Sequence, residues 1–153
     1  MTRKTKDGIV VYNPEDFEKM RRAGKLAAEV LDYITDYVDV GVTTGELDDL
    51  CRKYIESHGA VPACLGYHGY PKSTCISINH VICHGIPDDR KLADGDILNI
   101  DVTVILDGWF GDTSRMYYAG KPKLKAARLC EVTYECMMRG IDVVRPGARF
   151  GDI

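Results

Sequence analysis

The segment from residue 96 to residue 118 constrains this sequence most, because Asp107-Gly108 separates two runs with strand-like patterns. An Asp-Gly pair between two such runs is a strong signal for a two-residue hairpin turn. The run 96–106 is also rich in β-branched residues, which favour a strand. We therefore predict an antiparallel hairpin with strands at 96–106 and 109–118.

A two-residue turn also fixes the register of this hairpin. If the residues that flank the turn face each other, Thr103 faces Asp112 and Asp101 faces Ser114. Side chains alternate between the two faces of a strand, so Asp101 and Asp112 become diagonal neighbours on one face. Such neighbours lie about 7 Å apart at Cβ, which lets their carboxylates converge.

Two ionised carboxylates this close repel each other, so either one is protonated or a cation lies between them. The first arrangement is that of aspartic proteases, and the second is that of dinuclear metal sites. Asn99 and Thr103 add oxygen donors to the same face, which favours a divalent metal ion. The opposite, apolar face is predicted to pack on helices. The alternative to a metal or proton-sharing site is a solvated outer face with two ordinary surface aspartates. A β-bulge in either strand would break the register on which the argument depends.

Helix-start signals predict two helices before the hairpin, at 14–39 and 44–58. Asn13 is a favourable N-cap, and Thr43 and Glu46 have the spacing of a capping box. Apolar residues at helical spacing predict the buried face of the first helix. These residues are Phe17, Met20, Ala27, Val30, Leu31, Ile34 and Val38.

Weaker signals predict the remaining elements. Short strands are expected at 74–79 and 81–84, and a third helix at 123–142. His84 would then lie at the end of a strand, from which it can reach into a cleft. Residues 1–8 are expected to form a mobile tail.

Composition excludes several classes of protein. With 45% hydrophobic and 28% charged residues, the chain is neither disordered nor collagen-like. We find no apolar run long enough to span a bilayer, and the charged N-terminus resembles no secretory signal. A formal net charge of −3 gives no support to general nucleic-acid binding. Six cysteines without a Cys-x-x-Cys pair favour free thiols in a reducing cytoplasm.

Other cysteine and histidine arrangements offer alternatives. The group Cys64, His68, Cys75 and His84 could bind zinc, but its spacings match no common structural zinc pattern. Three cysteines on predicted helices are expected to be small core residues: Cys51, Cys130 and Cys136.

A weak internal repeat relates the segments 41–47 and 147–153, at an offset of 106 residues. Two glycines, an acidic residue and an aliphatic residue align, and each copy follows a predicted long helix. The repeat is explained either by chance or by a pseudo-symmetric fold of which this chain holds about half.

Four motifs carry a family resemblance. They are Cys-Leu-Gly-Tyr-His-Gly-Tyr-Pro-Lys-Ser at 64–73, Cys-His-Gly-Ile-Pro at 83–87, Gly-Asp-Ile-Leu-Asn-Ile-Asp-Val-Thr at 95–103 and Gly-Asp-Thr-Ser at 111–114. Together they resemble the type I methionine aminopeptidases of the bacterial kind. The resemblance extends over residues 13–153 and corresponds to the N-terminal portion of that family.

This resemblance implies an α+β fold of the pita-bread type, shared by creatinases and aminopeptidases, in which two αβ halves enclose a dinuclear metal site. Residues 1–12 would be an N-terminal tail. Residues 13–120 would form the first αβ half, and residues 121–153 would begin a truncated second half.

The resemblance also implies roles for individual residues. Asp101 resembles the bidentate metal ligand, Asp112 the carboxylate that bridges both ions, and His84 the histidine that contacts the substrate. The implied cofactors are two divalent metal ions, such as Co, Mn, Fe, Zn or Ni. The walls of the methionine pocket would be Cys64, Tyr67, Tyr70 and Cys75.

The implied activity is removal of the initiator methionine from nascent proteins in the cytoplasm. The family's other ligands, a histidine and two glutamates, have no counterpart here, so we expect negligible peptidase activity from these 153 residues alone. A non-catalytic binding module on the same architecture is the alternative. A creatinase- or prolidase-like activity is a nearer enzymatic rival, which the loop between Cys64 and Cys75 disfavours.

The expected partners are the N-termini of nascent peptides, with no membrane and no specific nucleic acid. The basic residues Arg3, Lys4 and Lys6 leave two interpretations open. They either contact ribosomal RNA or form part of a solvated tail.

Overall fold

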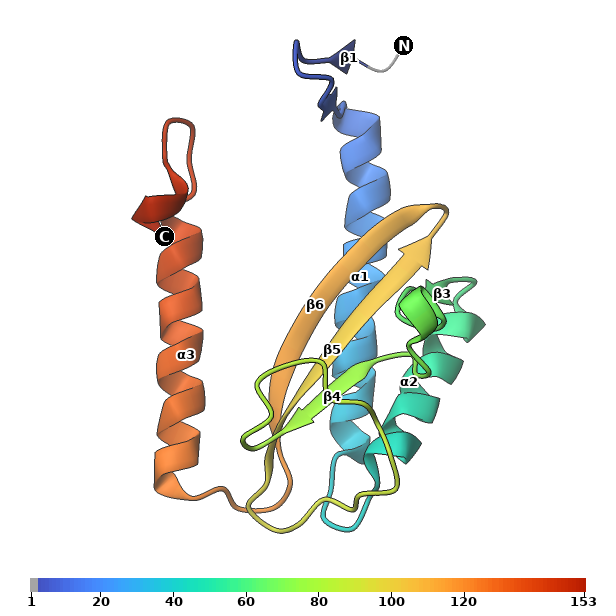
Figure 1. Ribbon diagram of the computed structural model, residues 1–153, viewed down its shortest axis with the longest axis vertical. Coiled ribbons are helices and arrows are strands. Elements are labelled where there is room, and N and C mark those ends of the chain that lie inside the picture. Colours follow the sequence, from blue (N-terminus) through green and yellow to red (C-terminus); the bar gives the residue numbers. More distant parts are fainter. Residues whose placement is uncertain (1–2) are drawn as a thin grey trace.

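The computed structural model describes residues 3–153 and contains one main antiparallel sheet flanked by helices (Figure 1). Helix α1 (Pro14–Ile34) packs along the hairpin formed by β5 (Ile97–Leu106) and β6 (Trp109–Tyr118). Helix α2 (Thr44–Ser57) packs beside α1. This arrangement is of the mixed helix-and-sheet class that the sequence predicts.

The hairpin has the predicted register. Thr103 pairs with Asp112, and Asp101 pairs with Ser114. Asp107 and Gly108 both have positive φ, of 51° and 81°, as a two-residue turn of this type requires. The pairing continues without a bulge over both strands, so the prediction that the two aspartates share a face is confirmed.

Two short strands share the second edge of β5. Strand β3 (Val61–Pro62) pairs with the part of β5 near the turn, and β4 (Cys75–Ile78) pairs with the part from Leu98 to Asp101. Strand β6 occupies one whole edge of β5. Strands β3 and β4 therefore both pair with the opposite edge, one after the other along its length. The loop 63–74 therefore leaves the sheet and returns to it beside Asp101.

The core lies between the apolar face of β5 and the helices. Five alternate residues form the apolar face that the sequence predicts for β5. Leu98, Ile100, Val102 and Val104 are fully buried, and Leu106, next to the turn, is partly buried against the core. From α1, the buried residues are Ala23, Leu26, Ala27, Val30, Leu31 and Ile34. Phe17 and Met20 were predicted for this face but are 47% and 54% exposed, because the first turns of α1 extend beyond the hairpin (Figure 1).

Both predicted N-terminal caps of the helices are confirmed, whereas the predicted end of the first helix is wrong. Asn13 caps α1, and Thr43 and Glu46 form the capping box of α2. Helix α1 ends at Ile34 and tightens into a 3₁₀ turn, η1 (Thr35–Tyr37), instead of continuing to residue 39. At this point the Leu31 carbonyl accepts hydrogen bonds from the hydroxyls of Thr35 (3.0 Å) and Tyr117 (2.6 Å).

The predicted strand at 81–84 is wrong. Asn79 and His84 have positive φ, of 52° and 55°, which a strand cannot accommodate. The chain turns away at Asn79, whose side chain donates to Asp96 (2.7 Å) and accepts from the amide of Ile97 (3.1 Å). His84 therefore lies in an irregular loop and not at a strand end.

The N-terminal segment is more ordered than a simple tail. Strand β1 (Arg3–Lys4) pairs with β2 (Val10–Val11), so the described part of the predicted mobile segment forms a small hairpin. Residues 1–2 lie outside the described residues. None of the helices in residues 3–153 is long and apolar enough to cross a membrane.

Helix α3 (Leu124–Asp142) matches its predicted range but stands apart from the rest of the structure (Figure 1). Of its residues only Cys130 and Gly140 are buried. Cys136 is exposed, so its predicted place in the core is wrong, whereas Cys51 and Cys130 are buried as predicted. The large apolar side chains that α3 exposes are Leu124, Leu129, Val132, Tyr134, Met137, Met138 and Ile141.

The close contact between α1 and β6 predicts the effect of two glycine substitutions. A Cβ at Gly111 would lie 2.2 Å from the backbone oxygen of Ala23, whereas Gly24 on the same helix has open space around it. We expect Gly111→Ala to lower the free energy of unfolding by about 3 kcal/mol, the upper end of overpacking costs. Urea denaturation of the chain measures this change.

Gly24→Ala is the matched control, and we expect it to be neutral or to stabilise the helix by up to about 1 kcal/mol. Equal unfolding midpoints for Gly111→Ala and the unsubstituted chain would show that α1 can move away from β6 without cost.

Candidate functional site

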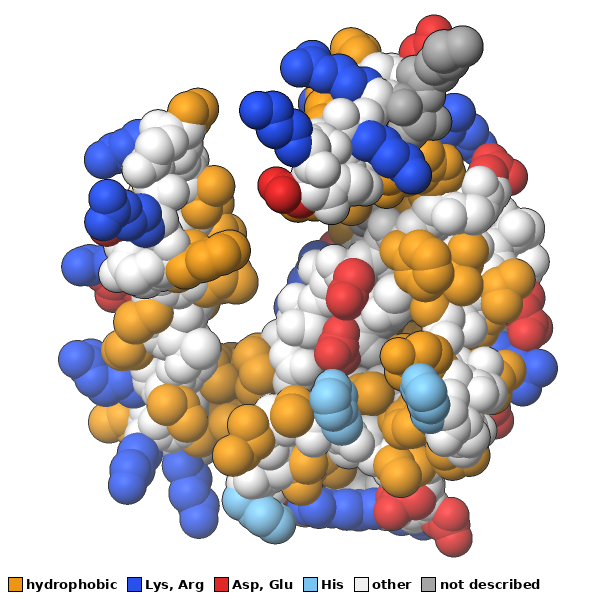
Figure 2. Space-filling model, turned by 45° about the horizontal axis from the view of Figure 1, so that its top comes forward, with side chains coloured by type: hydrophobic (Ala, Val, Ile, Leu, Met, Phe, Trp, Pro, Cys, Tyr) orange, Lys and Arg blue, Asp and Glu red, His pale blue; other side chains and the backbone are white. Residues whose placement is uncertain are grey.

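The two aspartates and His84 meet on the polar face of the hairpin. Burial raises the pKa of the Asp101 carboxyl, and the charge and hydrogen bonding of nearby Asp112 raise it further. His84 acts in the opposite direction and lowers the pKa of Asp101, so it is also close. Figure 2 shows acidic and histidine side chains side by side on this surface, beside the hollow next to α3. The structure therefore joins three of the predicted site residues.

His84 is held in place through its neighbour Gly85. The Gly85 amide donates to Ser77 Oγ (3.1 Å), and the Gly85 carbonyl accepts from the Ile76 amide (2.9 Å). A Cβ at Gly85 would lie 2.2 Å from the Ile76 oxygen, so only glycine fits this contact with β4. The irregular loop thus places His84 beside the aspartates even though the predicted strand is absent.

Cys64, Tyr70 and Cys75 form a second group next to the aspartates. The Ala63 amide donates to the Thr103 carbonyl (2.9 Å), and Cys75 pairs with Asp101, so both cysteines reach β5 at adjacent positions. Burial raises the pKa of the Cys64 thiol to about 11, with further contributions from Cys75 and Asp101. At neutral pH the Cys64 thiol is therefore uncharged.

The hydroxyl of Tyr70 fastens this group to the loop that carries His84. It lies 2.9 Å from the Thr74 carbonyl and 3.2 Å from the Gly85 carbonyl, and can donate to either. Burial and hydrogen bonding to Cys75 raise the pKa of Tyr70, so its hydroxyl stays protonated. Its ring is half-buried beside the two thiols.

Tyr67 is the one predicted pocket residue that does not join the others. It is 68% exposed, and its ring packs edge-on against His68 with 4.4 Å between ring centroids. Both residues belong to a short 3₁₀ turn, η2 (Tyr67–Gly69), at the outer end of the loop.

The sequence prediction missed Asp48, which lies behind the loop. Asp48 is only 2% exposed, and its carboxylate accepts hydrogen bonds from the backbone of Ser73 and Thr74. A signal was available, because Asp48, Cys51 and Ile55 have the i, i+3, i+7 spacing of a buried helical face. An acidic residue on such a face needs partners inside the protein.

The donor set of the polar face suits a divalent cation only in part. Carboxylate oxygens such as those of Asp101 and Asp112 are good ligands for hard divalent ions. Within residues 3–153, however, no group of three or more His, Cys, Asp or Glu side chains could hold a metal ion. The alternative zinc site is therefore wrong, and the two aspartates can supply only part of a coordination sphere.

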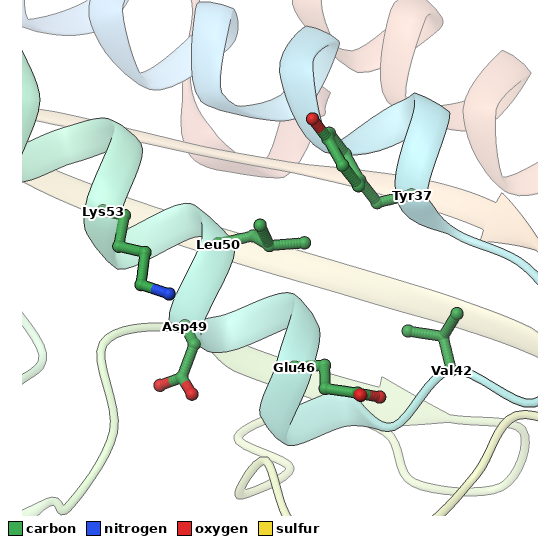
Figure 3. A pocket seen from close by; sticks show the side chains of 6 residues that line it. All are labelled: Tyr37, Val42, Glu46, Asp49, Leu50 and Lys53. Carbon is green, nitrogen blue, oxygen red and sulfur yellow. The ribbon is translucent and has the colours of Figure 1, made fainter.

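A surface pocket between η1 and α2, with a volume of about 330 Å³, lies elsewhere (Figure 3). Its lining includes none of the candidate site residues. The residues that line it are Tyr37, Val42, Glu46, Asp49, Leu50 and Lys53.

Residues 18–153 match the Metallopeptidase family M24, and the chain belongs to this family. Solved structures share its pita-bread fold. One is methionine aminopeptidase from Rickettsia prowazekii, with a TM-score of 0.92 and 60% identity over 99% of this chain and 58% of that one. Another is an Xaa-Pro dipeptidase from Bacillus anthracis, with a TM-score of 0.74 and 17% identity over 85% of this chain and 35% of that one. At such low identity this similarity supports the fold and not a shared function.

The curated relatives confirm the resemblance to bacterial methionine aminopeptidases. The chain is 64% identical over 145 residues to the methionine aminopeptidase of Rickettsia prowazekii, a match that covers 95% of this chain and 56% of that protein. It is 60% identical over 148 residues to that of Escherichia coli strain K12, with the same coverages. The chain thus spans little more than half the length of these relatives.

The raised pKa of Asp101 predicts how stability depends on pH. A carboxyl whose pKa is higher in the folded state than in the unfolded state stabilises the fold at low pH, and this contribution is lost as the pH rises through the folded-state pKa. Replacing Asp112 by Asn removes one cause of the shift. We therefore expect Asp112→Asn to become increasingly more stable than the unsubstituted chain between pH 4 and pH 7.

Urea unfolding in the presence of a chelator measures this difference, with the exposed loop variant Asp89→Asn as the control. If Asp112→Asn and Asp89→Asn showed the same pH dependence, the two carboxylates would not interact in the folded chain.

Proposed function

We propose that this chain supplies one side of the active site of a methionine aminopeptidase that removes the initiator methionine from nascent proteins. The observation that carries the proposal is the convergence of Asp101 and Asp112 next to His84 and the pocket group of Cys64, Tyr70 and Cys75. The identity to methionine aminopeptidases over 95% of the chain supports it.

In this proposal, Asp101 and Asp112 would hold two divalent metal ions through their carboxylate oxygens. The position of these residues on one open polar face leaves room for further ligands from outside residues 3–153. When bound, the ions would activate water for hydrolysis of the first peptide bond. His84 would donate a hydrogen bond near the scissile amide and thereby stabilise developing charge there.

The substrate pocket is proposed to consist of Cys64, Tyr70 and Cys75, with Tyr67 at its mouth. Uncharged thiols and an aromatic ring give a soft, polarisable wall that suits the thioether of a methionine side chain. Because this wall lies beside Asp101, a methionine bound there would present its amino group and first carbonyl to the metal ligands.

We also propose that α3 belongs to a second αβ half, with residues 1–12 as a tail and residues 13–120 as the first half. The offset of 106 residues aligns Leu129, Val132 and Met137 of α3 with Ala23, Leu26 and Leu31, which α1 buries against the hairpin. These three residues of α3 are 61%, 42% and 50% exposed. We propose that a second sheet covers this stripe.

A non-catalytic binding module is the second candidate function. The observation that favours it is the absence, within residues 3–153, of a third ligand beside the two aspartates. In either case the proposed partners are nascent peptide N-termini in the cytoplasm. Contact with ribosomal RNA through Arg3, Lys4 and Lys6 is a further proposal.

Metal titration distinguishes the two candidate functions. If the polar face is a metal site, calorimetry with Mn²⁺ or Co²⁺ should show weak binding, with a dissociation constant of about 1 mM because few charged ligands are present. Asp112→Ala should abolish this heat, and Asp89→Ala should leave it unchanged. Absence of binding to the unsubstituted chain would favour the binding module.

We expect no turnover of a Met-Ala-Ser peptide by the 153-residue chain with either metal, because most coordination positions are left to water. Turnover that Asp112→Ala eliminates would contradict this expectation and show that the chain is sufficient for catalysis.

The exposed stripe of α3 predicts self-association of the isolated chain. A double variant, Leu129→Glu with Met137→Glu, should shift sedimentation velocity profiles toward the monomer, since it places charge in the middle of the apolar stripe. The control, Lys125→Glu with Arg128→Glu, changes charge on the same helix and leaves the stripe intact. A sharp monomer peak for the unsubstituted chain would contradict the prediction.

A further inference from the structure

We propose that Asp48 is a positioning residue that holds the loop 63–74 against β4 and thereby sets the shape of the pocket formed by Cys64, Tyr70 and Cys75. The assignment of that pocket to methionine rests on the proposed function. The role of Asp48 in the loop rests on contacts within the described residues.

The burial of Asp48 requires an explanation. An ionised carboxylate that loses its water costs several kcal/mol unless charges or hydrogen bonds replace it. The salt bridges of the described residues do not include Asp48, and Lys72 attracts it without forming one. Burial accordingly raises the pKa of Asp48 above its usual value.

Hydrogen bonds from the loop take the place of a cation. Oδ1 of Asp48 accepts from the Ser73 amide (3.0 Å), the Thr74 amide (2.8 Å) and the Thr74 hydroxyl (2.7 Å). Oδ2 has a single long contact of 3.4 Å, to the Ser73 amide. Asp48 thus anchors the chain where it re-enters the sheet, immediately before Cys75.

From this anchor the contacts continue to the pocket and to the loop of His84. The Thr74 carbonyl lies 2.9 Å from the hydroxyl of Tyr70, which lies 3.2 Å from the Gly85 carbonyl. Ser73 and Thr74 are fully buried, so the anchor is rigidly enclosed. Displacing Thr74 would therefore move Cys75 directly and would release Tyr70 from one of its two acceptors.

All three short hydrogen bonds end on Oδ1 of Asp48, so the effect of a substitution at this position should depend on whether the new side chain keeps an acceptor there. Asparagine offers a carbonyl oxygen at that position and should retain the anchor. Leucine has nearly the same shape but no acceptor, and would leave two buried amides without partners. Asp49, the exposed neighbour on α2, provides the control Asp49→Leu.

The test is alkylation of the 153-residue chain by iodoacetamide, followed at each cysteine by mass spectrometry. In Asp48→Leu we expect Cys75 to react at least tenfold faster, while Cys51, which is fully buried on α2, keeps its slow rate. Asp48→Asn should stay within twofold of the unsubstituted chain, and Asp49→Leu should not differ from it. Thr74→Val, which removes one of the three bonds, should give an intermediate rate and provides the test if Asp48→Leu does not fold.

Two results would overturn the proposal. One is an equal acceleration at Cys51 and Cys75, because it would mean that Asp48 supports the whole fold and not the loop. The other is an unchanged rate at Cys75 in both Asp48→Leu and Thr74→Val.

A separate arm tests the proposed pocket itself. Methioninamide should slow the alkylation of Cys64 and Cys75 in the unsubstituted chain. If it gives no protection while the variants behave as expected, the positioning role of Asp48 stands and the methionine pocket fails.

Discussion

The register between β5 and β6 determines which side chains can meet in this protein. Asp107 and Gly108, both with positive φ, set that register, and the ladder runs to the far ends of both strands without interruption. A slip of one residue would turn Asp101 into the core and the apolar face of β5 toward solvent. The packing of α1 and the meeting of the two aspartates therefore depend on the same turn.

The sequence could predict this part of the molecule because its signals are local. The turn pair, the alternation along β5 and the capping residues Asn13 and Thr43 each specify backbone geometry within a few residues. Counting paired residues back from the turn then shows that Asp101 and Asp112 lie on the same face of the hairpin. The comparisons then place the chain in the family that the motifs indicated.

The remaining features depend on contacts that sequence spacing does not reveal. His84 reaches the aspartates from an irregular loop, because Gly85 is locked onto β4 and not because a strand ends there. The strand β3 is only two residues long, too short for a periodic signal. Asp48 is satisfied by residues 25 and 26 positions away, so its sequence neighbours do not explain its burial. Phe17 and Met20 have helical spacing but lie where α1 has no sheet beneath it.

Strands β3 and β4 share one edge of β5, and the loop 63–74 between them is held in a different way from the strands themselves. The strands on either side of the loop 63–74 are tied to β5 by backbone hydrogen bonds, which tolerate many side chains. The loop itself is tied to the body through Ser73, Thr74 and Tyr70. Changes in the outer part of the loop, residues 65–69, would therefore leave Asp101 and Asp112 in register on the hairpin. Such a layout lets the loop diverge in evolution without risk to the scaffold.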